Sequence, residues 1–135
     1  MKTLLLMKHA DSEPKNKLHD DWFRPLTDHG QKEALQIGKM LAAENLVPDL
    51  ILTSSAVRAE QTAKIIIDAL DQSCDLHSLD ELYLAENEDY YQIIQKSPNR
   101  AKTLLVVGHN PHLSRLLTVM IEKEQAIPSA SIAVV

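Results

Sequence analysis

Several residue types are scarce in this chain, and each shortage excludes a class of protein. Cys74 is the only cysteine, so no intramolecular disulfide can form and no cluster of thiolates can hold a metal. No apolar run approaches the roughly 20 residues that a membrane-spanning helix needs. Only the four apolar residues 4–7 precede Lys8, too few for the apolar core of about 7–15 residues in a secretion signal. We therefore expect a soluble protein in the reducing cytoplasm, with no membrane contact.

Basic residues are also few relative to acidic ones. The sequence has 14 Lys and Arg against 19 Asp and Glu, which gives a formal net charge of −5. A nucleic-acid partner is not expected, because such a surface needs basic groups gathered over a wide area. Any site for an anion must instead be local and built from a few cations.

What the chain does contain is enough apolar material for one folded unit. Hydrophobic residues make up 44% of its 135 residues, and no linker rich in Gly, Pro or Ser divides it. We therefore expect a single domain over residues 1–135.

Short apolar runs alternate with longer segments whose apolar residues recur at helical spacing. The runs predict strands at residues 3–7, 49–55, 75–79, 103–108 and 131–135, and the longer segments predict helices over residues 31–46, 56–70, 87–96 and 109–123. We expect Thr27 or Asp28 to cap the first helix, Pro48 to end it, and Ser54 or Ser55 to cap the second. This alternation predicts an α/β fold in three α/β/α layers with a mostly parallel central sheet.

Polar residues follow three of the predicted strands, at the sheet edge where open α/β folds bind ligands. They are Lys8 and His9 after the first strand, Ser54, Ser55 and Arg58 after the second, and Gly108, His109 and Asn110 after the fourth. A guanidinium, an ammonium and helix N-termini together suit a phosphate dianion. Histidine can also form a covalent intermediate near neutral pH. The combination indicates phosphoryl transfer through a phosphohistidine.

Other interpretations of these histidines remain open at this point. His109 and His112 are three residues apart on a predicted helix, so they could share a metal ion with His9. No carboxylate ligand accompanies them, and Arg58 would repel a cation, which disfavours a metal site. His9 could also be no more than the polar end of a strand.

Four short motifs carry a resemblance to a known family. They are "MKHA" (residues 7–10), "RPLTDHG" (24–30), "SSAVRAEQTA" (54–63) and "VVGHNP" (106–111). Their order is that of the histidine phosphatase superfamily, and the chain most resembles its short branch of phosphohistidine phosphatases similar to SixA. The resemblance implies a phosphoglycerate-mutase-like fold and a role in phosphorelay signalling.

The resemblance also implies a role for each matching residue. His9 would be the nucleophile, and Arg58 and His109 would bind the phosphoryl oxygens and stabilise charge in the transition state. Arg24 would be a further phosphate ligand. Apart from the resemblance, Ser54 is first of all a candidate helix cap, with phosphate contact as a secondary role. No metal or other cofactor is implied. The expected partners are a phosphohistidine-containing protein or a small phosphorylated molecule, and phosphate ion.

The sequence departs from the family pattern at two positions. Lys8 stands where the family usually has arginine, which keeps the charge but loses the bidentate fork, so we expect weaker transition-state stabilisation. Glu81 lies roughly where larger members carry a proton donor, although solvent can protonate a phosphoramidate leaving group. Hydrolysis of a small phosphoester or pyrophosphate and phosphate binding without turnover are the alternative functions.

Overall fold

Five strands form one sheet in the order β3-β2-β4-β1-β5. The structure, a computed structural model, describes residues 3–15, 20–84, 89–98, 100–121 and 132–134. The strands are β1 (Thr3–Lys8), β2 (Leu50–Ser54), β3 (Asp75–Leu79), β4 (Thr103–Gly108) and β5 (Ile132–Val134). The first four are mutually parallel and β5 runs antiparallel to β1, so the prediction of a mostly parallel sheet is confirmed. The last predicted strand, over residues 131–135, extends outside the described residues at both ends.

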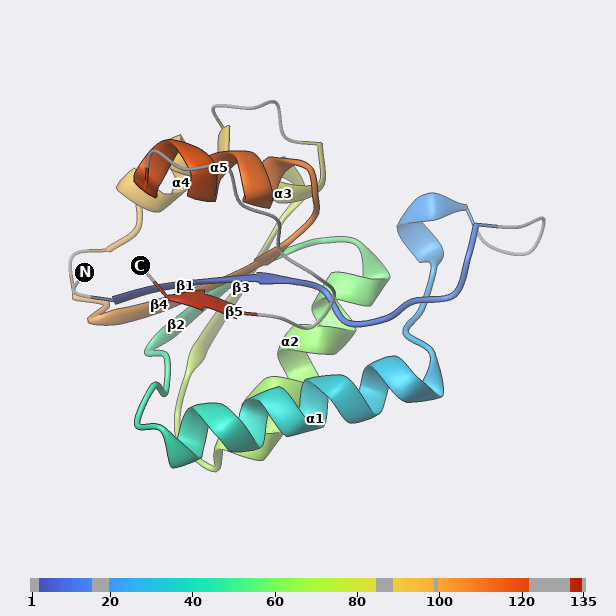
Figure 1. The fold of residues 1–135 in the computed structure, drawn as a ribbon, viewed down its shortest axis with the longest axis horizontal. Helices are drawn as coiled ribbons and strands as arrows, with labels where there is room; N and C mark the ends of the chain where they lie inside the picture. The colour runs from blue at the N-terminus through green and yellow to red at the C-terminus, as the bar shows by residue number, and fades with distance from the viewer. Residues whose placement is uncertain (1–2, 16–19, 85–88, 99, 122–131, 135) are drawn as a thin grey trace.

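Helices cover both faces of the sheet, as Figure 1 shows, with α1 and α2 on one side and α3, α4 and α5 on the other. Their bounds are α1 (Asp28–Ala43), α2 (Val57–Leu70), α3 (Asp80–Leu84), α4 (Asp89–Gln95) and α5 (His112–Ile121), and a short 3₁₀ helix η1 spans Asp21–Phe23. This confirms the three-layer α/β/α fold. Among the described residues, no helix combines the length and apolar character that crossing a membrane requires.

The sheet has two separate apolar cores because alternate residues of each strand point to opposite faces. On β1, Leu4 and Leu6 pack with Leu113 of α5, whereas Leu5 and Met7 pack toward α1 and α2. All four of these β1 residues are buried. The continuous apolar run that predicted this strand is thus explained by burial on both faces.

The first helix ends by a different device from the one predicted. It stops at Ala43, well before Pro48, and Asn45 then adopts a left-handed conformation with φ of 55°. The Leu46 N–H donates to the Leu41 carbonyl at 2.9 Å, which satisfies an otherwise unpaired carbonyl of the last turn. The prediction that Pro48 ends the helix is therefore wrong, because asparagine tolerates the left-handed turn and terminates the helix earlier.

The expected serine caps are also absent from α2. Its N-cap is Ala56, which has no side chain able to accept a hydrogen bond. The Ser54 hydroxyl accepts from the Ala56 N–H at 3.2 Å, and Ser55 accepts from the Trp22 indole N–H at 3.2 Å. Both serines therefore hold the loop between β2 and α2, and neither caps the helix.

The segment "RPLTDHG" fixes the start of α1 against the loop that follows β1. Thr27 is the N-cap, and its hydroxyl accepts from the Gly30 N–H at 2.9 Å. The Thr27 N–H donates to the Asp11 carbonyl at 3.0 Å, which brings the loop backbone directly over the first turn. A Cβ at Gly30 would lie 2.0 Å from the Asp11 carbonyl oxygen, so only glycine fits there. The motif thus anchors the backbone two residues after His9.

We predict that Gly30→Ala lowers the free energy of unfolding by about 2 kcal/mol or more, because the clash is between a new Cβ and main-chain atoms that cannot rotate away. Urea denaturation would measure the loss. Lys32→Ala, on the exposed face of the same helix, is the matched control and should change stability by less than about 0.5 kcal/mol. Equal stability of the two variants would contradict the anchoring role of Gly30.

Candidate active site

The carboxyl ends of β1 and β4 bring two histidines together. Lys8 pairs with Gly108 in the parallel register, and the His9 N–H donates to the Gly108 carbonyl at 3.1 Å. The ring centroids of His9 and His109 are consequently 5.2 Å apart. Arg58, in the first turn of α2, lies between them with Nε 3.2 Å from His9 Nε2 and Nη2 3.4 Å from His109 Nδ1. Three segments distant in sequence therefore converge as predicted.

The backbone selects the tautomer of His9. Its Nδ1 lies 2.7 Å from the Ala10 carbonyl oxygen, an acceptor that requires a proton on Nδ1. Nε2 therefore carries the lone pair, and this atom faces Arg58. Burial lowers the pKa of His9 to about 4, the hydrogen bond to Ala10 opposes this shift, and the charge of Arg58 adds to it. His9 is thus a neutral imidazole with a nucleophilic nitrogen at neutral pH.

His109 is held neutral in the same way and is positioned by Ser54. Its Nε2 lies 2.7 Å from the Ser54 hydroxyl, which also accepts from the Ala56 N–H. Both contacts are satisfied when Nε2–H donates to Ser54 and Nδ1 accepts from Arg58. Burial, then Arg58 and His9, lower the pKa of His109 to about 3. Ser54 is fully buried behind His109 and does not line the pocket.

Tyr90 of α4 supports His109 from beneath. Its hydroxyl accepts the His109 N–H at 3.1 Å and donates to the Leu82 carbonyl at 2.7 Å. A Cβ at Gly108 would lie 2.5 Å from the Tyr90 hydroxyl oxygen, so the glycine in "VVGHNP" makes room for this contact. The role of Tyr90 could not be predicted from the sequence, because no local pattern connects α4 with the end of β4.

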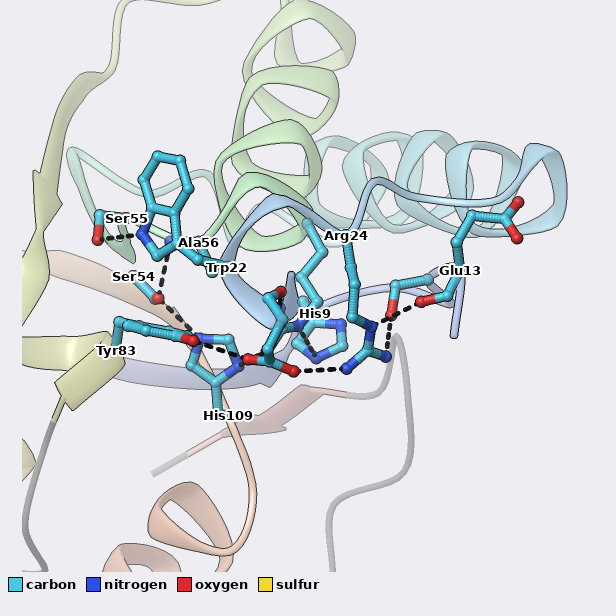
Figure 2. A network of polar contacts seen from close by, with 12 residues as sticks. His9, Glu13, Trp22, Arg24, Ser54, Ser55, Ala56, Tyr83 and His109 are labelled. Carbon is cyan, nitrogen blue, oxygen red and sulfur yellow. Dashed lines mark hydrogen bonds and ion pairs between the residues drawn. The ribbon is translucent and has the colours of Figure 1, made fainter. Parts of the chain in front are cut away.

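Asp21 is the main feature of the site that the sequence did not reveal. Its carboxylate accepts from Arg24 Nη1 at 2.8 Å, from Arg58 Nη2 at 3.1 Å and from the Tyr83 hydroxyl at 2.8 Å. Two of these donors, Arg24 and Tyr83, are labelled in Figure 2. Burial alone would raise the pKa of Asp21, but the hydrogen bonds from Tyr83, Arg24 and Arg58 outweigh it and hold that pKa well below its usual range. The carboxylate therefore stays ionised.

Arg24 reaches the same pocket and is tied to the loop after β1. Its Nε donates to the Glu13 carbonyl at 2.6 Å and its Nη2 to the Ser12 hydroxyl at 3.0 Å. With the contact to Asp21, each of its three nitrogens has a protein partner. Arg24 is thus oriented before any ligand binds.

These side chains line a pocket of about 750 Å³, which is much larger than a phosphate ion. Around it lie residues from the loop after β1, from η1, α2 and α3, and from the start of α5. The lining residues are Lys8, His9, Asp11, Ser12, Asp21, Arg24, Arg58, Tyr83, Leu84, His109, Asn110 and His112.

A metal site is not formed by the three histidines considered from the sequence. The ring of His112 stacks on Tyr90 at a centroid distance of 5.8 Å, whereas His9 and His109 face Arg58. Within the described residues, no three His, Cys, Asp or Glu side chains are placed to share a metal ion.

A family model for the histidine phosphatase superfamily (branch 1) matches residues 4–104. The chain belongs to this superfamily.

Solved structures of the superfamily share the fold over nearly the whole chain. A protein assigned as phosphohistidine phosphatase SixA of Agrobacterium tumefaciens is 29% identical, with a TM-score of 0.91 over 98% of this chain and 90% of that one. A SixA phosphohistidine phosphatase solved with tungstate is 24% identical, with a TM-score of 0.86 over 98% of this chain and 86% of that one. The resemblance to SixA proteins is therefore confirmed.

Curated relatives are longer proteins. The phosphoglycerate mutase of Candida albicans is 36% identical over 110 residues, which are 80% of this chain and 43% of that protein. The 2,3-bisphosphoglycerate-dependent phosphoglycerate mutase of Mycobacterium leprae is 39% identical over 71 residues, 51% of this chain and 29% of that one. The chain thus spans less than half the length of these relatives.

Lys8, which replaces the usual arginine of the superfamily, lines the pocket and is half-buried. Over the part of the chain that the structure describes, its ammonium has no hydrogen-bond or ion-pair partner, in contrast to Arg24 and Arg58. Lys8 is therefore a cation whose charge is still available to a ligand.

Glu81 does not reach the pocket. It lies on α3 but is exposed, whereas Tyr83, two residues later, lines the pocket and packs edge-on against His109 at 5.6 Å. Two residues correspond to a rotation of about 200° around a helix, which separates the two side chains. The residue named from the sequence is thus close to the pocket along the chain, but no helix is predicted there, and α3 brings Tyr83 rather than Glu81 into the pocket.

We predict that the protein loses stability as the pH falls from 6.5 to about 4.5. Unfolding restores both histidines to a pKa near 6.5, from about 4 for His9 and about 3 for His109, so the unfolded chain binds more protons in this window. The melting temperature should fall across it. Asp21 contributes only below this window, because its stabilisation is lost as the pH drops beneath the ordinary carboxyl pKa of 3.8.

His109→Gln should flatten this pH dependence, because it removes one of the two titrating rings while keeping an amide able to bond with Ser54. A parallel pH series of thermal melts on parent and variant would measure the difference. An unchanged slope in the variant would contradict the neutral, buried state of His109.

Proposed function

We propose that this protein is a metal-independent phosphatase that works through a phosphohistidine at His9. The observation that carries the proposal is the fixed tautomer of His9, whose Nδ1 is held by the Ala10 carbonyl while Nε2 faces Arg58 inside the pocket. A neutral imidazole with its lone pair directed at an anion-binding cradle is the arrangement that nucleophilic attack on phosphorus requires.

The proposed reaction has two displacements. His9 Nε2 attacks phosphorus in line, the bond to the leaving group breaks, and the leaving group takes its electron pair and a proton from solvent. Water then attacks the phosphohistidine, phosphate leaves, and His9 returns to the neutral form. Arg58, His109 and Lys8 bind the phosphoryl oxygens, and Arg24 adds a further cation at the pocket wall.

For this to happen, the phosphoryl group must take the place of the contact between Arg58 Nε and His9 Nε2. The nucleophilic lone pair is then released toward phosphorus, and the guanidinium turns its donor to a phosphoryl oxygen. His109 must gain a proton on Nδ1 to donate to the dianion, and the negative charge of the ligand favours that protonation.

As substrate we propose phosphohistidine on a partner protein, such as a phosphorelay component of the cytoplasm. The likeness to the SixA protein of Agrobacterium tumefaciens supports this choice, as does a pocket of about 750 Å³ that can admit a protein side chain. An imidazole leaving group needs no acid from the protein. This suits a pocket in which Asp21 is kept ionised and Glu81 is not among the lining residues.

Two other functions have a specific observation in their favour. The phosphoglycerate mutases among the relatives favour a small phosphoester as substrate, with the same nucleophile. Lys8 in place of arginine, together with the Arg58 contact on the lone pair of His9, favours a module that binds phosphate without turnover.

An assay of parent and His9→Ala separates these functions. We predict that the parent releases phosphate from a phosphohistidine protein faster than from an aryl phosphate, that excess chelator changes neither rate, and that His9→Ala loses at least about 100-fold. In the reaction with the aryl phosphate, acid-labile phosphate bound to the quenched protein would be quantified to detect the intermediate on His9.

Equal rates for parent and His9→Ala would reject the nucleophile. Absence of turnover on both substrates would favour the binding module, preference for the aryl phosphate would favour a small phosphoester, and loss of activity in chelator would reject metal independence.

We further predict that Lys8→Arg raises kcat severalfold. An arginine restores bidentate binding of the phosphoryl oxygens where lysine supplies a point charge. Steady-state kinetics on the better substrate would test this, with Lys102→Arg as a control because Lys102 is exposed and outside the pocket. A large loss in Lys8→Arg would show instead that the site has adapted to lysine.

A further inference from the structure

A permanent negative charge lies in the wall of a pocket that otherwise collects cations. The Asp21 carboxylate lines this pocket and is fixed by donors from three elements, Arg24, Arg58 of α2 and Tyr83 of α3. Its main-chain carbonyl also accepts from Arg58 Nη1, so both the backbone and the side chain of Asp21 are held. The carboxylate cannot turn away from the pocket without giving up these contacts.

Asp21 also occupies N–H donors of Arg24 and Arg58 that a ligand could otherwise reach. Arg58 has five N–H donors, and four of its contacts are to His9, His109, and the carbonyl and carboxylate of Asp21. Arg24 donates from all three nitrogens, one of them to Asp21. One phosphoryl dianion can displace the contacts to the histidines, but a second anionic group would meet Asp21.

We propose that Asp21 is a specificity-determining residue, which admits phosphoryl compounds whose remainder carries no negative charge and rejects those with a second anionic group. The leaving groups that it admits include imidazole, amines and neutral alcohols. Those that it rejects carry a carboxylate or a second phosphate close to the phosphoryl group.

The charges of the pocket lining agree with this selection. Lys8, Arg24 and Arg58 supply its three fixed cations, and Asp11 and Asp21 supply two carboxylates. Within the described residues, Lys8 is the one of these three cations without a protein partner. It is adjacent to His9, so the phosphoryl group that His9 receives would pair with the Lys8 ammonium. A second anionic group would then lie near the Asp21 carboxylate, and among the described residues that line the pocket no other unpaired cation would remain to bind it.

Binding of two isosteric phosphonates tests the selection without requiring turnover. Phosphonoacetate and phosphonoacetamide differ by one negative charge next to the same phosphonate, and neither can be hydrolysed by phosphoryl transfer. Calorimetry at a pH above the second ionisation of both phosphonates would give two dissociation constants for each protein. We expect the parent to prefer the amide by about tenfold, and Asp21→Asn to reduce the preference to about twofold.

Two further variants separate charge from structure. Asp20→Asn removes the neighbouring, exposed carboxylate, which does not line the pocket, so the preference should stay at about tenfold. Tyr83→Phe removes a donor to Asp21 but keeps its charge, and should also keep the preference. If Asp21→Asn weakens both phosphonates equally, or leaves the ratio as in the parent, the proposal is overturned and Asp21 serves only to position the arginines.

The inference rests on the proposed function only in that both place the phosphoryl group beside His9. A parent that shows the tenfold preference but turns over no phosphorylated substrate would contradict the phosphatase and retain the selection by Asp21. A parent that hydrolyses phosphohistidine but binds both phosphonates equally would retain the phosphatase and reject the selection. Failure to bind either phosphonate would reject the selection, whereas the phosphatase would still be decided by the turnover of phosphohistidine.

Discussion

The site depends on the contacts that the buried guanidinium of Arg58 makes. Arg58 touches His9, His109 and Asp21, and its side chain is about 6% exposed, so its charge acts in a medium that screens it poorly. Burial is the larger reason why the two imidazoles are neutral, and the charge of Arg58 adds to it. The hydrogen bonds from Tyr83 and Arg24, together with Arg58, keep the Asp21 carboxylate ionised. A cation in the first turn of a helix opposes the helix dipole, and the ring of acceptors around Arg58 compensates for this.

Much of the fold could be predicted because its signals are local. Strands buried on both faces give continuous apolar runs, as in β1 and β4, and α1 and α2 show helical spacing. Parallel strands end at one edge, so the residues after β1, β2 and β4 had to meet there. His9, Arg58 and His109 were therefore predictable as a group, although their chemical roles stay predictions.

The rest of the site depends on contacts that no local pattern encodes. Asp21 is the first residue of the short 3₁₀ helix η1, within a polar stretch that has no helical periodicity, and its partner Tyr83 is 62 residues away on another short helix. Ser54 looked like a helix cap because serine before a helix usually is one, but here Ala56 is the N-cap of a helix that begins at Val57, and the Ser54 hydroxyl contacts His109. Glu81 and Tyr83 could be told apart only when the rotation of α3 was known.

The acceptor that fixes the tautomer of His9 belongs to the main chain. In many enzymes a side-chain carboxylate orients the catalytic histidine, so a single substitution can remove that orientation. Here the Ala10 carbonyl does so, and any residue at position 10 would supply the same oxygen, provided it fits the fully buried space. The fold itself therefore sets the tautomer of the nucleophile. Substitutions in the surrounding side chains, including the unusual Lys8, leave the lone pair on the same nitrogen of His9.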